Sequence, residues 1–243
     1  METVKLQKYF SDCAIMSRRA AEEEIKKGKI TVNGEVATLG SRIDPERDVV
    51  IYKGKRVLLP KKDKTYVLLN KPRGIVTTLS DEKGRPTVIS LLRGLGTRVY
   101  PVGRLDIDSD GLLLLTDDGE LTNRLTHPRH QIPKIYHVTV KGELQAEQLK
   151  KLTSALVIDG YKIQPVAVEI IKKEPSTTTL KMTLFEGRNR QIRKMCALCE
   201  LSITTLTRVA LGNISLGSLP VGKWRYLSDD EVAYLKAESA PKD

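Results

Sequence analysis

A stretch from Gly103 to Leu121, with the sequence GRLDIDSDGLLLLTDDGEL, constrains the fold more than any other part of this 243-residue chain. Three aspartates, Asp106, Asp108 and Asp110, alternate with other residues, and an unbroken aliphatic run follows at residues 112–115. Such a run predicts a buried strand that leaves an acidic loop. Because a buried strand fixes the loop beside it, this loop can present one carboxylate in a defined geometry.

The acidic loop allows three interpretations. Its aspartates and the following glycine match the start of a calcium loop, but the twelfth position is Asp117 instead of a bidentate Glu, and a predicted strand stands where further ligating residues belong. A second interpretation makes Asp108 and Asp110 turn residues that hydrogen-bond only the local backbone, and we favour it for these two positions. A third makes Asp106 a catalytic nucleophile flanked by Arg104.

The charge of the chain predicts a polyanionic partner. Lys and Arg number 41 against 30 Asp and Glu, which gives a net charge of +11. Aromatic residues make up only 5% of the chain. We therefore expect recognition through shape and phosphate contacts and not through a broad base-stacking surface.

The cysteines indicate a reducing compartment. Cys13, Cys196 and Cys199 are too few and too unevenly spaced for a disulfide framework. The C-x-x-C lacks the second ligand pair of a zinc site, so we expect Cys196 and Cys199 to pack a helix face. The N-terminal segment lacks the apolar core of a signal peptide, and no apolar run reaches membrane-spanning length. These features predict a soluble, cytoplasmic protein that binds no metal.

The first sixty residues predict a helix pair followed by a small sheet. Helices are expected at residues 4–13 and 18–27, the second capped by Ser17 and ended by Gly28. Asn33-Gly34 predicts a tight hairpin, with a further strand at 49–52. Charge alone leaves a solvated helix surface as plausible as an RNA-binding one. Basic residues cluster around the helix pair at Lys5, Lys8, Arg18, Arg19, Lys26, Lys27 and Lys29.

Residues 53–64 contain six basic residues and little hydrophobic periodicity, which predicts a linker. Beyond it, a glycine turn at 186–187 enters a strongly basic helix, a pattern typical of a phosphate-binding helix start. Strands and short helices alternate through the rest of the chain. Strands are expected at 66–70, 112–115, 133–140, 166–172 and 178–185, and helices at 87–92, 121–125, 146–156 and 229–236.

Several of these motifs together resemble one family. GRLD followed by DGLLLLT closely resembles the catalytic segment of the RsuA-type RNA pseudouridine synthases, and NKPRG at 70–74, K-x-Y at 134–136 and QIR at 191–193 are similar to its other motifs. Residues 4–52, with SRR and VNG, resemble the αL RNA-binding motif of a small-subunit ribosomal protein. The resemblance implies an α+β protein. Its expected parts are an RNA-binding domain at 1–60, a linker at 61–64, and a catalytic domain at 65–243 with a mixed, mainly antiparallel sheet.

The resemblance also implies roles for particular residues. Asp106 is expected to attack a flipped uridine without a cofactor, and Arg193 to form an ion pair that keeps Asp106 ionised in a pocket that excludes water. The resemblance places Tyr136 beside the target base, although the residues alone favour a core tyrosine. Arg104 is expected to fill the space that the flipped nucleotide leaves. Contacts to RNA are expected from Arg188, Arg190 and Lys194.

The expected substrate is ribosomal RNA or a ribosomal assembly intermediate, bound by a monomer. QIRKMC followed by LPVGKWRYLSDDEV is closer to the large-subunit branch of the family, with small-subunit ribosomal RNA or transfer RNA as alternatives. A non-catalytic ribosome-assembly factor would lack Asp106, Tyr136 or Arg193, and all three are present. A glycoside hydrolase would explain two carboxylates but not the basic charge or the N-terminal module.

Overall fold

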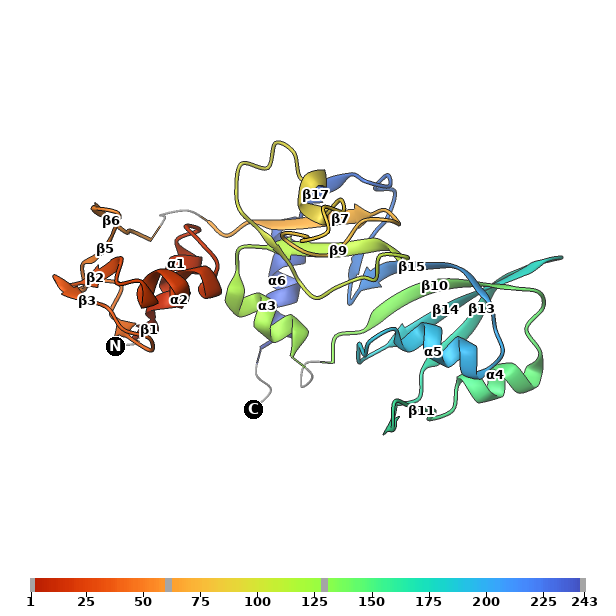
Figure 1. Ribbon diagram of the computed structural model, residues 1–243. Coiled ribbons are helices and arrows are strands. Elements are labelled where there is room, and N and C mark those ends of the chain that lie inside the picture. Colours follow the sequence, from red (N-terminus) through yellow and green to blue (C-terminus); the bar gives the residue numbers. More distant parts are fainter. Residues whose placement is uncertain (1–2, 60–62, 128–130, 241–243) are drawn as a thin grey trace. The chain divides into compact units, whose positions relative to one another are not determined.

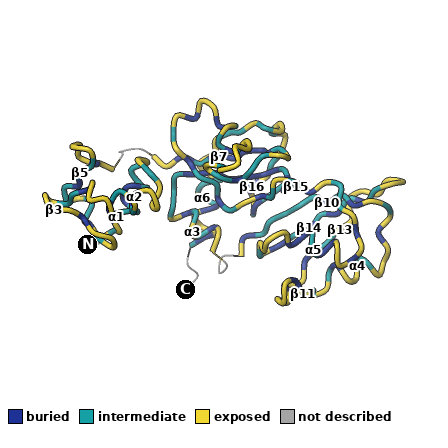
Figure 2. Tube along the Cα trace, viewed as in Figure 1, coloured by how far each residue is buried: buried dark blue, intermediate teal, exposed yellow. Residues whose placement is uncertain are grey.

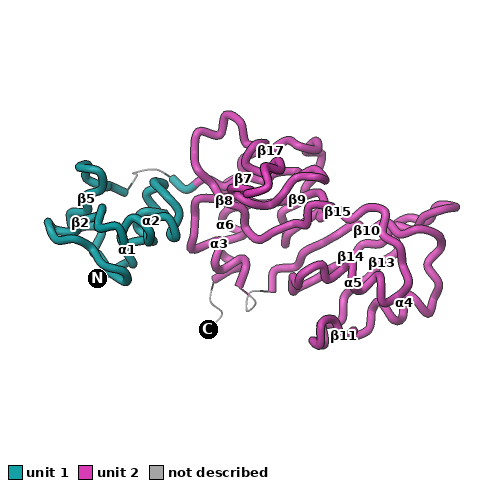
Figure 3. The backbone as a smooth tube through the Cα atoms, in the orientation of Figure 1, with its two compact units in different colours: residues 1–64 teal, residues 65–243 magenta. Residues whose placement is uncertain are grey.

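The structure, a computed structural model, describes residues 3–59, 63–127 and 131–240. The chain divides into two compact units, Met1–Lys64 and Thr65–Asp243 (Figure 3). Residues 61 and 62 of the predicted linker lie outside the described residues. Among the helices described, none has the length and apolar character needed to cross a membrane.

The N-terminal unit combines a helix pair with short strands. Ser17 Oγ accepts a hydrogen bond from the N–H of Ala20 at the start of the second helix, and Asn33 and Gly34 adopt positive φ in the predicted hairpin turn. A separate core of apolar side chains, including Phe10 and Ile30, holds the unit together. Its elements are β1 (Val4–Lys5), α1 (Leu6–Asp12), α2 (Arg18–Lys26), β2 (Ile30–Val32), β3 (Glu35–Val36), β4 (Arg42–Ile43), β5 (Val50–Tyr52) and β6 (Lys55–Arg56).

Two boundaries in this unit differ from the prediction. The first helix begins at Leu6, because the two residues before it form β1 and pair with β4. The stretch that begins at Lys53 is not entirely linker, since β6 folds back on β5 and Val57 is buried in the core. The many basic residues concealed this hairpin, although Lys53 and Gly54 form its positive-φ turn.

The larger unit is built on a mixed, mainly antiparallel sheet, as predicted. The strand order is β13-β14-β10-β15-β9-β7-β17, with β16 on β15 and β8 on β9, and β15 with β9 is the parallel pair (Figure 1). A separate hairpin joins β11 (Val157–Ile158) to β12 (Tyr161–Lys162). The sheet strands are β7 (Tyr66–Lys71), β8 (Tyr100–Pro101), β9 (Asp110–Thr116), β10 (Lys134–Lys141), β13 (Ala167–Glu174), β14 (Thr177–Leu184), β15 (Ile203–Leu211), β16 (Ile214–Ser215) and β17 (Trp224–Tyr226).

Helices cover the two parts of this sheet separately. On β10, β14 and β15, one core forms with the helices α4 (Ala146–Leu152) and α5 (Gln191–Leu198), and it includes Cys196 and Cys199 as predicted. On β7 and β9, another core forms with α3 (Gly119–Thr126) and α6 (Asp229–Glu238). The opposite face of β7 and β9 packs against the short 3₁₀ helix η1 (Val88–Leu91) and the segments around it.

Strand β9 is buried on both faces, which explains its aliphatic run (Figure 2). Leu112 and Leu114 belong to the core with α3 and α6, whereas Leu113 and Leu115 belong to the core around η1. Side chains of a strand alternate between its faces, so two separate cores require an unbroken apolar sequence. The expected buried strand is therefore confirmed.

The joint between the two parts of the sheet is short. Strands β9 and β15 pair through Asp110 with Thr207 and Gly111 with Arg208. Gly111 has a φ of +100°, and a Cβ there would lie 2.3 Å from the carbonyl oxygen of Arg208. Only glycine allows this approach. The joint brings the acidic loop before β9 against the part of the sheet that carries α5.

Candidate active site

A buried lysine anchors the acidic loop. Lys71 at the end of β7 has no exposed surface, and its Nζ donates to the carbonyl oxygens of Pro72 (3.0 Å), Asp106 (3.1 Å) and Ser109 (2.8 Å). Burial lowers the pKa of Lys71 to about 8, while Asp110, Asp108 and Asp106 oppose this shift. Three acceptors match the three N–H groups of an ammonium, so Lys71 is charged at neutral pH and fixes the main chain around Asp106.

Further hydrogen bonds hold the same main chain. Thr77 Oγ1 donates to the carbonyl of Leu105 at 2.7 Å, and the N–H of Gly74 donates to the carbonyl of Ile107 at 2.7 Å. The N–H of Ser109 donates to the carbonyl of Asp106 at 3.1 Å, closing a turn. Backbone groups on both sides of Asp106 are therefore satisfied, and its side chain projects from a fixed turn.

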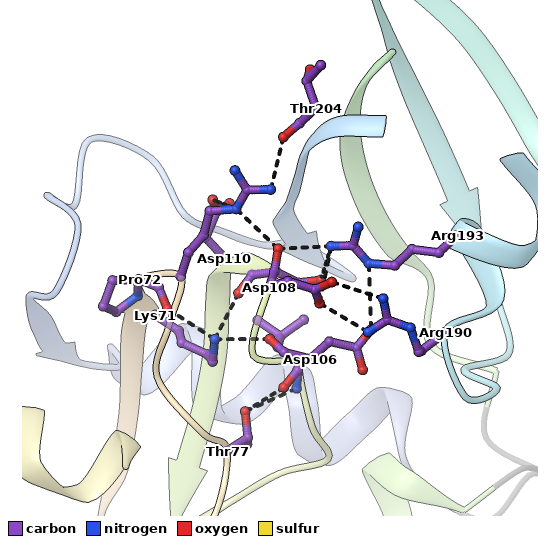
Figure 4. A network of polar contacts seen from close by, with 12 residues as sticks. Lys71, Pro72, Thr77, Asp106, Asp108, Asp110, Arg190, Arg193 and Thr204 are labelled. Atoms are coloured by element: carbon purple, nitrogen blue, oxygen red, sulfur yellow. Dashed lines mark hydrogen bonds and ion pairs between the residues drawn. The ribbon is translucent and has the colours of Figure 1, made fainter. Parts of the chain in front are cut away.

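Two arginines from the start of α5 face this turn (Figure 4). Asp106 Oδ2 lies 3.5 Å from Arg190 Nη1 and 3.9 Å from Arg193 Nε. Nη2 of Arg193 donates to the carbonyl of Asp108 at 2.9 Å and to Ser109 Oγ at 3.1 Å. The structure therefore brings Asp106 and Arg193 together, at the outer limit of an ion pair, and adds Arg190 as a closer cation.

Asp108 was predicted to hydrogen-bond only the local backbone, and this prediction is wrong. Its carboxylate pairs with Arg190 through Nη1 to Oδ1 at 3.2 Å and Nη2 to Oδ2 at 2.9 Å, and Oδ1 lies 3.4 Å from Arg193 Nη2. These guanidinium groups, Arg190 first, lower the pKa of Asp108. Asp108 therefore bridges the loop to α5. The prediction failed because its partners lie more than 80 residues further along the chain.

Asp110 is also not a simple turn residue. It is the first residue of β9, and its Oδ2 lies 3.9 Å from Arg73 Nε. Arg73 in turn donates to the carbonyls of Asp108 (3.1 Å) and Thr204 (2.9 Å), linking the loop after β7 to the segment that begins β15. Asp110 and Arg73 therefore belong to the junction between the two parts of the sheet.

Asp106 is more open to solvent than the sequence analysis expects. Its side chain is 31% exposed, whereas that of Arg193 is 16% exposed. Among the described residues, Arg193 Nε is buried and has no hydrogen-bond partner, although it lies nearest Asp106 Oδ2 at 3.9 Å. A buried donor without an acceptor is costly, so a small movement of Asp106 toward Arg193 would be favourable.

Tyr136 and Arg104 occupy different surroundings. Tyr136 on β10 is half-buried and packs against two cores, one containing α5 and the other containing Leu105, the neighbour of Asp106. Tyr136 also pairs across the sheet with Arg208, a buried arginine whose Nε donates to the carbonyl of Leu112 at 2.7 Å. The Arg104 side chain is exposed and makes no hydrogen bond or ion pair within the described ranges.

The remaining predicted RNA contacts of the larger unit lie around the start of α5. Arg188 stacks on the ring of Tyr161, with 3.1 Å between the guanidinium carbon and the ring centroid, and lies 3.4 Å from Glu186. Lys194 forms an ion pair with Asp159 in the turn between β11 and β12. Arg188 is therefore an exposed cation and Lys194 a half-buried one, and both lie beside the arginines that face Asp106.

In the smaller unit, several of the predicted RNA-binding lysines pair with nearby acids. Lys26 lies 2.8 Å from Glu23, Lys27 and Lys29 lie 3.1 and 3.4 Å from Glu24, and the ion pairs are exposed on the lysine side. Lys8 pairs with Asp12 one helical turn away. The described residues offer no ion-pair partner to Lys5, Arg18 and Arg19, which are exposed.

Sequence reasoning included Lys71 and Arg73 in the NKPRG motif but gave neither a role of its own, and it missed the ion pairs of Arg190 with the acidic loop. Lys71 follows the apolar residues of β7 directly and precedes Pro72, and a lysine at the end of a buried strand is the available signal. The calcium interpretation is not supported, since β9 begins within the proposed loop and Asp117 Oδ1 accepts from the N–H of Thr65 at 2.7 Å. Within the described ranges no group of three or more potential ligands could hold a metal ion.

The site and fold define the class of the protein. The family model for RNA pseudouridylate synthases matches residues 65–198, and the chain belongs to this family. Residues 16–50 match the S4 domain, in agreement with the RNA-binding motif expected there. The predicted family and fold class are therefore confirmed.

Individual relatives resemble the chain over nearly its whole length. The chain is 38% identical to "Ribosomal large subunit pseudouridine synthase B" of Bacillus subtilis, covering 96% of each. It is 36% identical to "Dual-specificity RNA pseudouridine synthase RluF" of Escherichia coli K12, covering 96% of this chain and 78% of that one. A solved structure described as "Crystal structure of pseudouridylate synthase" matches with a TM-score of 0.67 and 28% identity, covering 96% and 99%.

Proposed function

We propose that this protein converts one uridine of large-subunit ribosomal RNA to pseudouridine, with Asp106 as the nucleophile. The observation that carries the proposal is a carboxylate on a fixed turn, faced by the guanidinium groups of Arg190 and Arg193. The relative from B. subtilis, named as a large-subunit enzyme, supports the choice of substrate. A carboxylate is nucleophilic at neutral pH and leaves readily, as a reversible attack requires.

The reaction is an isomerisation, in which the N1 glycosidic bond breaks, the base turns, and C5 joins the sugar. Asp106 acts either on the sugar C1′ or on the uracil ring. Both routes require an ionised carboxylate, which neighbouring guanidinium groups favour electrostatically. Lys71 serves as a positioning residue, since its three hydrogen bonds fix the main chain on both sides of Asp106.

Two further residues have proposed roles beside the target nucleotide. Tyr136 packs against the bound base, because it lies at the boundary of the cores that contain Leu105 and α5. Arg104 stacks in the space that the flipped nucleotide leaves, and its exposed side chain without internal partners within the described ranges supports this role. A base within a helix is out of reach of any carboxylate, so flipping precedes the chemistry.

The proposed partner is ribosomal RNA or a ribosomal assembly intermediate, and the proposed state is a cytoplasmic monomer. The S4 domain supports RNA binding by the smaller unit, which we assign to residues 1–60 with a linker at 61–64 and the catalytic domain at 65–243. The exposed side chains of Lys5, Arg18 and Arg19, which have no ion-pair partner within the described ranges, are the first candidates for phosphate contacts.

Asp106→Asn tests the proposal. The amide keeps the shape of the side chain but removes the nucleophile, so release of tritium from ribosomal RNA labelled at C5 of uridine should fall by at least about a thousandfold. RNA affinity should change by less than about tenfold, because the change is one charge at a partly exposed position. Asp230→Asn, at an exposed position on α6, is the matched control. Full turnover by Asp106→Asn would refute the assignment.

A further inference from the structure

The carboxylate of Asp108 binds a side chain in the way that a phosphate group would. It faces Arg190 with both oxygens, at 3.2 Å from Nη1 and 2.9 Å from Nη2 (Figure 4). Arginine binds carboxylates and phosphates with this same bidentate geometry. Arg193 adds a second cation, with Nη2 at 3.4 Å from Oδ1. The two guanidinium groups thus form an anion site that an aspartate of the same chain occupies.

The main chain of Asp108 has two hydrogen bonds that do not involve its carboxylate. Its carbonyl oxygen accepts from Arg193 Nη2 at 2.9 Å and from Arg73 Nε at 3.1 Å. Its carboxylate is held by Arg190 and more distantly by Arg193. Rotation of the side chain would therefore release the carboxylate without moving the turn that carries Asp106.

The pair is placed where an external anion can reach it. The side chains of Asp108 and Arg190 are each 41% exposed. Exposed ion pairs contribute little net stability, because water competes for both partners. Arg190 also lies 3.5 Å from Asp106, so an anion bound to Arg190 would stand beside the proposed nucleophile. In RNA, the group that accompanies a flipped nucleotide to this place is a backbone phosphate.

We propose that Arg190 and Arg193 form a binding site for an RNA phosphodiester at the mouth of the proposed active site, and that Asp108 occupies this site until RNA displaces it. The identity of the RNA phosphate rests on the proposed function. Asp108 acts as an internal competitor: it lowers the affinity for RNA in general. A phosphate delivered to the mouth of the active site takes its place on Arg190.

The test measures binding of a fluorescein-labelled RNA hairpin that contains no uridine, so that catalysis cannot influence the result. Asp108→Asn removes the competing charge. It should bind the hairpin about fivefold more tightly than the unaltered protein at moderate salt, the size expected when an exposed ion pair ceases to compete. The slope of log affinity against log salt should steepen by roughly 0.9, the value for one further phosphate contact.

Two further variants decide whether the gain is specific. Glu200→Gln makes the same charge change at an exposed position beyond the end of α5 and should leave affinity unchanged. Arg190→Gln should weaken binding more in the Asp108→Asn background than in the unaltered protein, because Arg190 is free only there. Unchanged or weaker binding by Asp108→Asn, an equal gain from Glu200→Gln, or an additive double variant would overturn the proposal. If the unaltered protein released no tritium from labelled ribosomal RNA, the proposed function would be refuted. The binding results for Asp108→Asn would still support the phosphodiester site.

Discussion

Helices α2 and α5 both carry Lys and Arg residues, but their charges have different partners. On α2, Lys26 pairs with Glu23 three residues earlier, and both side chains are more than half exposed. On α5, Arg193 and its neighbour Arg190 meet Asp106 and Asp108, which lie more than 80 residues earlier in the chain. A local pair between exposed side chains holds no other segment in place. A distant pair fixes two segments relative to each other and so defines a site.

The difference also separates recognition from chemistry. Cations such as Arg18 and Arg19, exposed and without an ion-pair partner within the described ranges, are suited to an RNA backbone, whose contacts are many and individually replaceable. The guanidinium of Arg193 is largely buried, and each of its contacts goes to the acidic turn. Removal of Arg193 should therefore lower the rate, whereas changes in the smaller unit should alter affinity alone.

The largest effect in this comparison is expected from Arg193→Ala. The substitution removes the positive charge that lies beside Asp106 and the hydrogen bond that Arg193 donates to Ser109 Oγ. Because this charge is preorganised, kcat should fall by about a hundredfold. Single-turnover tritium release at saturating RNA measures this effect. Arg193→Lys keeps the positive charge but loses the planar guanidinium, so its rate should lie between those of the unaltered protein and Arg193→Ala. A variant that lost only affinity would contradict a part for Arg193 in the chemical step and leave it phosphate binding alone.

Deletion of residues 1–64 should affect affinity and not the chemical step. The smaller unit has its own core and carries the S4 match, so we expect ribosomal RNA affinity to fall by about tenfold or more, with a shallower salt dependence. The rate at saturation with a short RNA should change much less. Unchanged affinity after truncation would show that this unit has another task.

A third prediction concerns the anchor of the acidic turn. Lys71→Met keeps an unbranched side chain of similar size but leaves the carbonyls of Pro72, Asp106 and Ser109 without their donor. The free energy of unfolding should drop by about 2–4 kcal/mol, as measured by urea denaturation. Lys83→Met, at an exposed lysine, should change it by less than about 0.5 kcal/mol. An equal loss in both variants would contradict the anchoring role.

The pH dependence provides a second test of Lys71. Its pKa is about 8 in the folded protein and 10.5 as the reference value, so the unfolded chain binds more protons between these limits. Stability therefore rises with pH in this window. Between pH 8 and pH 9.5, the titration of Lys71 should raise the free energy of unfolding by about 1–2 kcal/mol. This increment should be missing in Lys71→Met. A steeper rise in the variant than in the parent protein would refute the assignment.

The smallest effect is expected from Glu24→Gln on α2. This change frees Lys27 and Lys29, whose exposed side chains contribute little to folding through these ion pairs. Gln at this position can still accept the hydrogen bond that Tyr52 Oη donates to Glu24 at 3.1 Å. The thermal midpoint should not change measurably, while RNA affinity should rise by about twofold if these lysines reach phosphates. Fluorescence anisotropy with a ribosomal RNA fragment measures the affinity. A loss of affinity would show that Glu24 itself positions the helix on RNA.

Much of the local structure was predictable because its causes lie within a few residues. Ser17 caps α2 from the position directly before it, and Asn33-Gly34 turns the chain at the hairpin. The strand at 112–115 follows from its unbroken apolar pattern, which a strand buried on both faces requires. The family resemblance, confirmed by the match at residues 65–198, predicted the class of reaction.

The sequence by itself therefore determined many of the elements, the class of the protein and Asp106 as the candidate nucleophile. Only the tertiary structure decided which cations surround that carboxylate, how Lys71 fixes its turn, and that Asp108 is the anion bound by Arg190. The physical reason is distance along the chain. Turns, caps and strand patterns are set by neighbouring residues. The aspartates of the acidic loop and the arginines at α5 meet only because the two parts of the sheet join at Gly111 and Arg208.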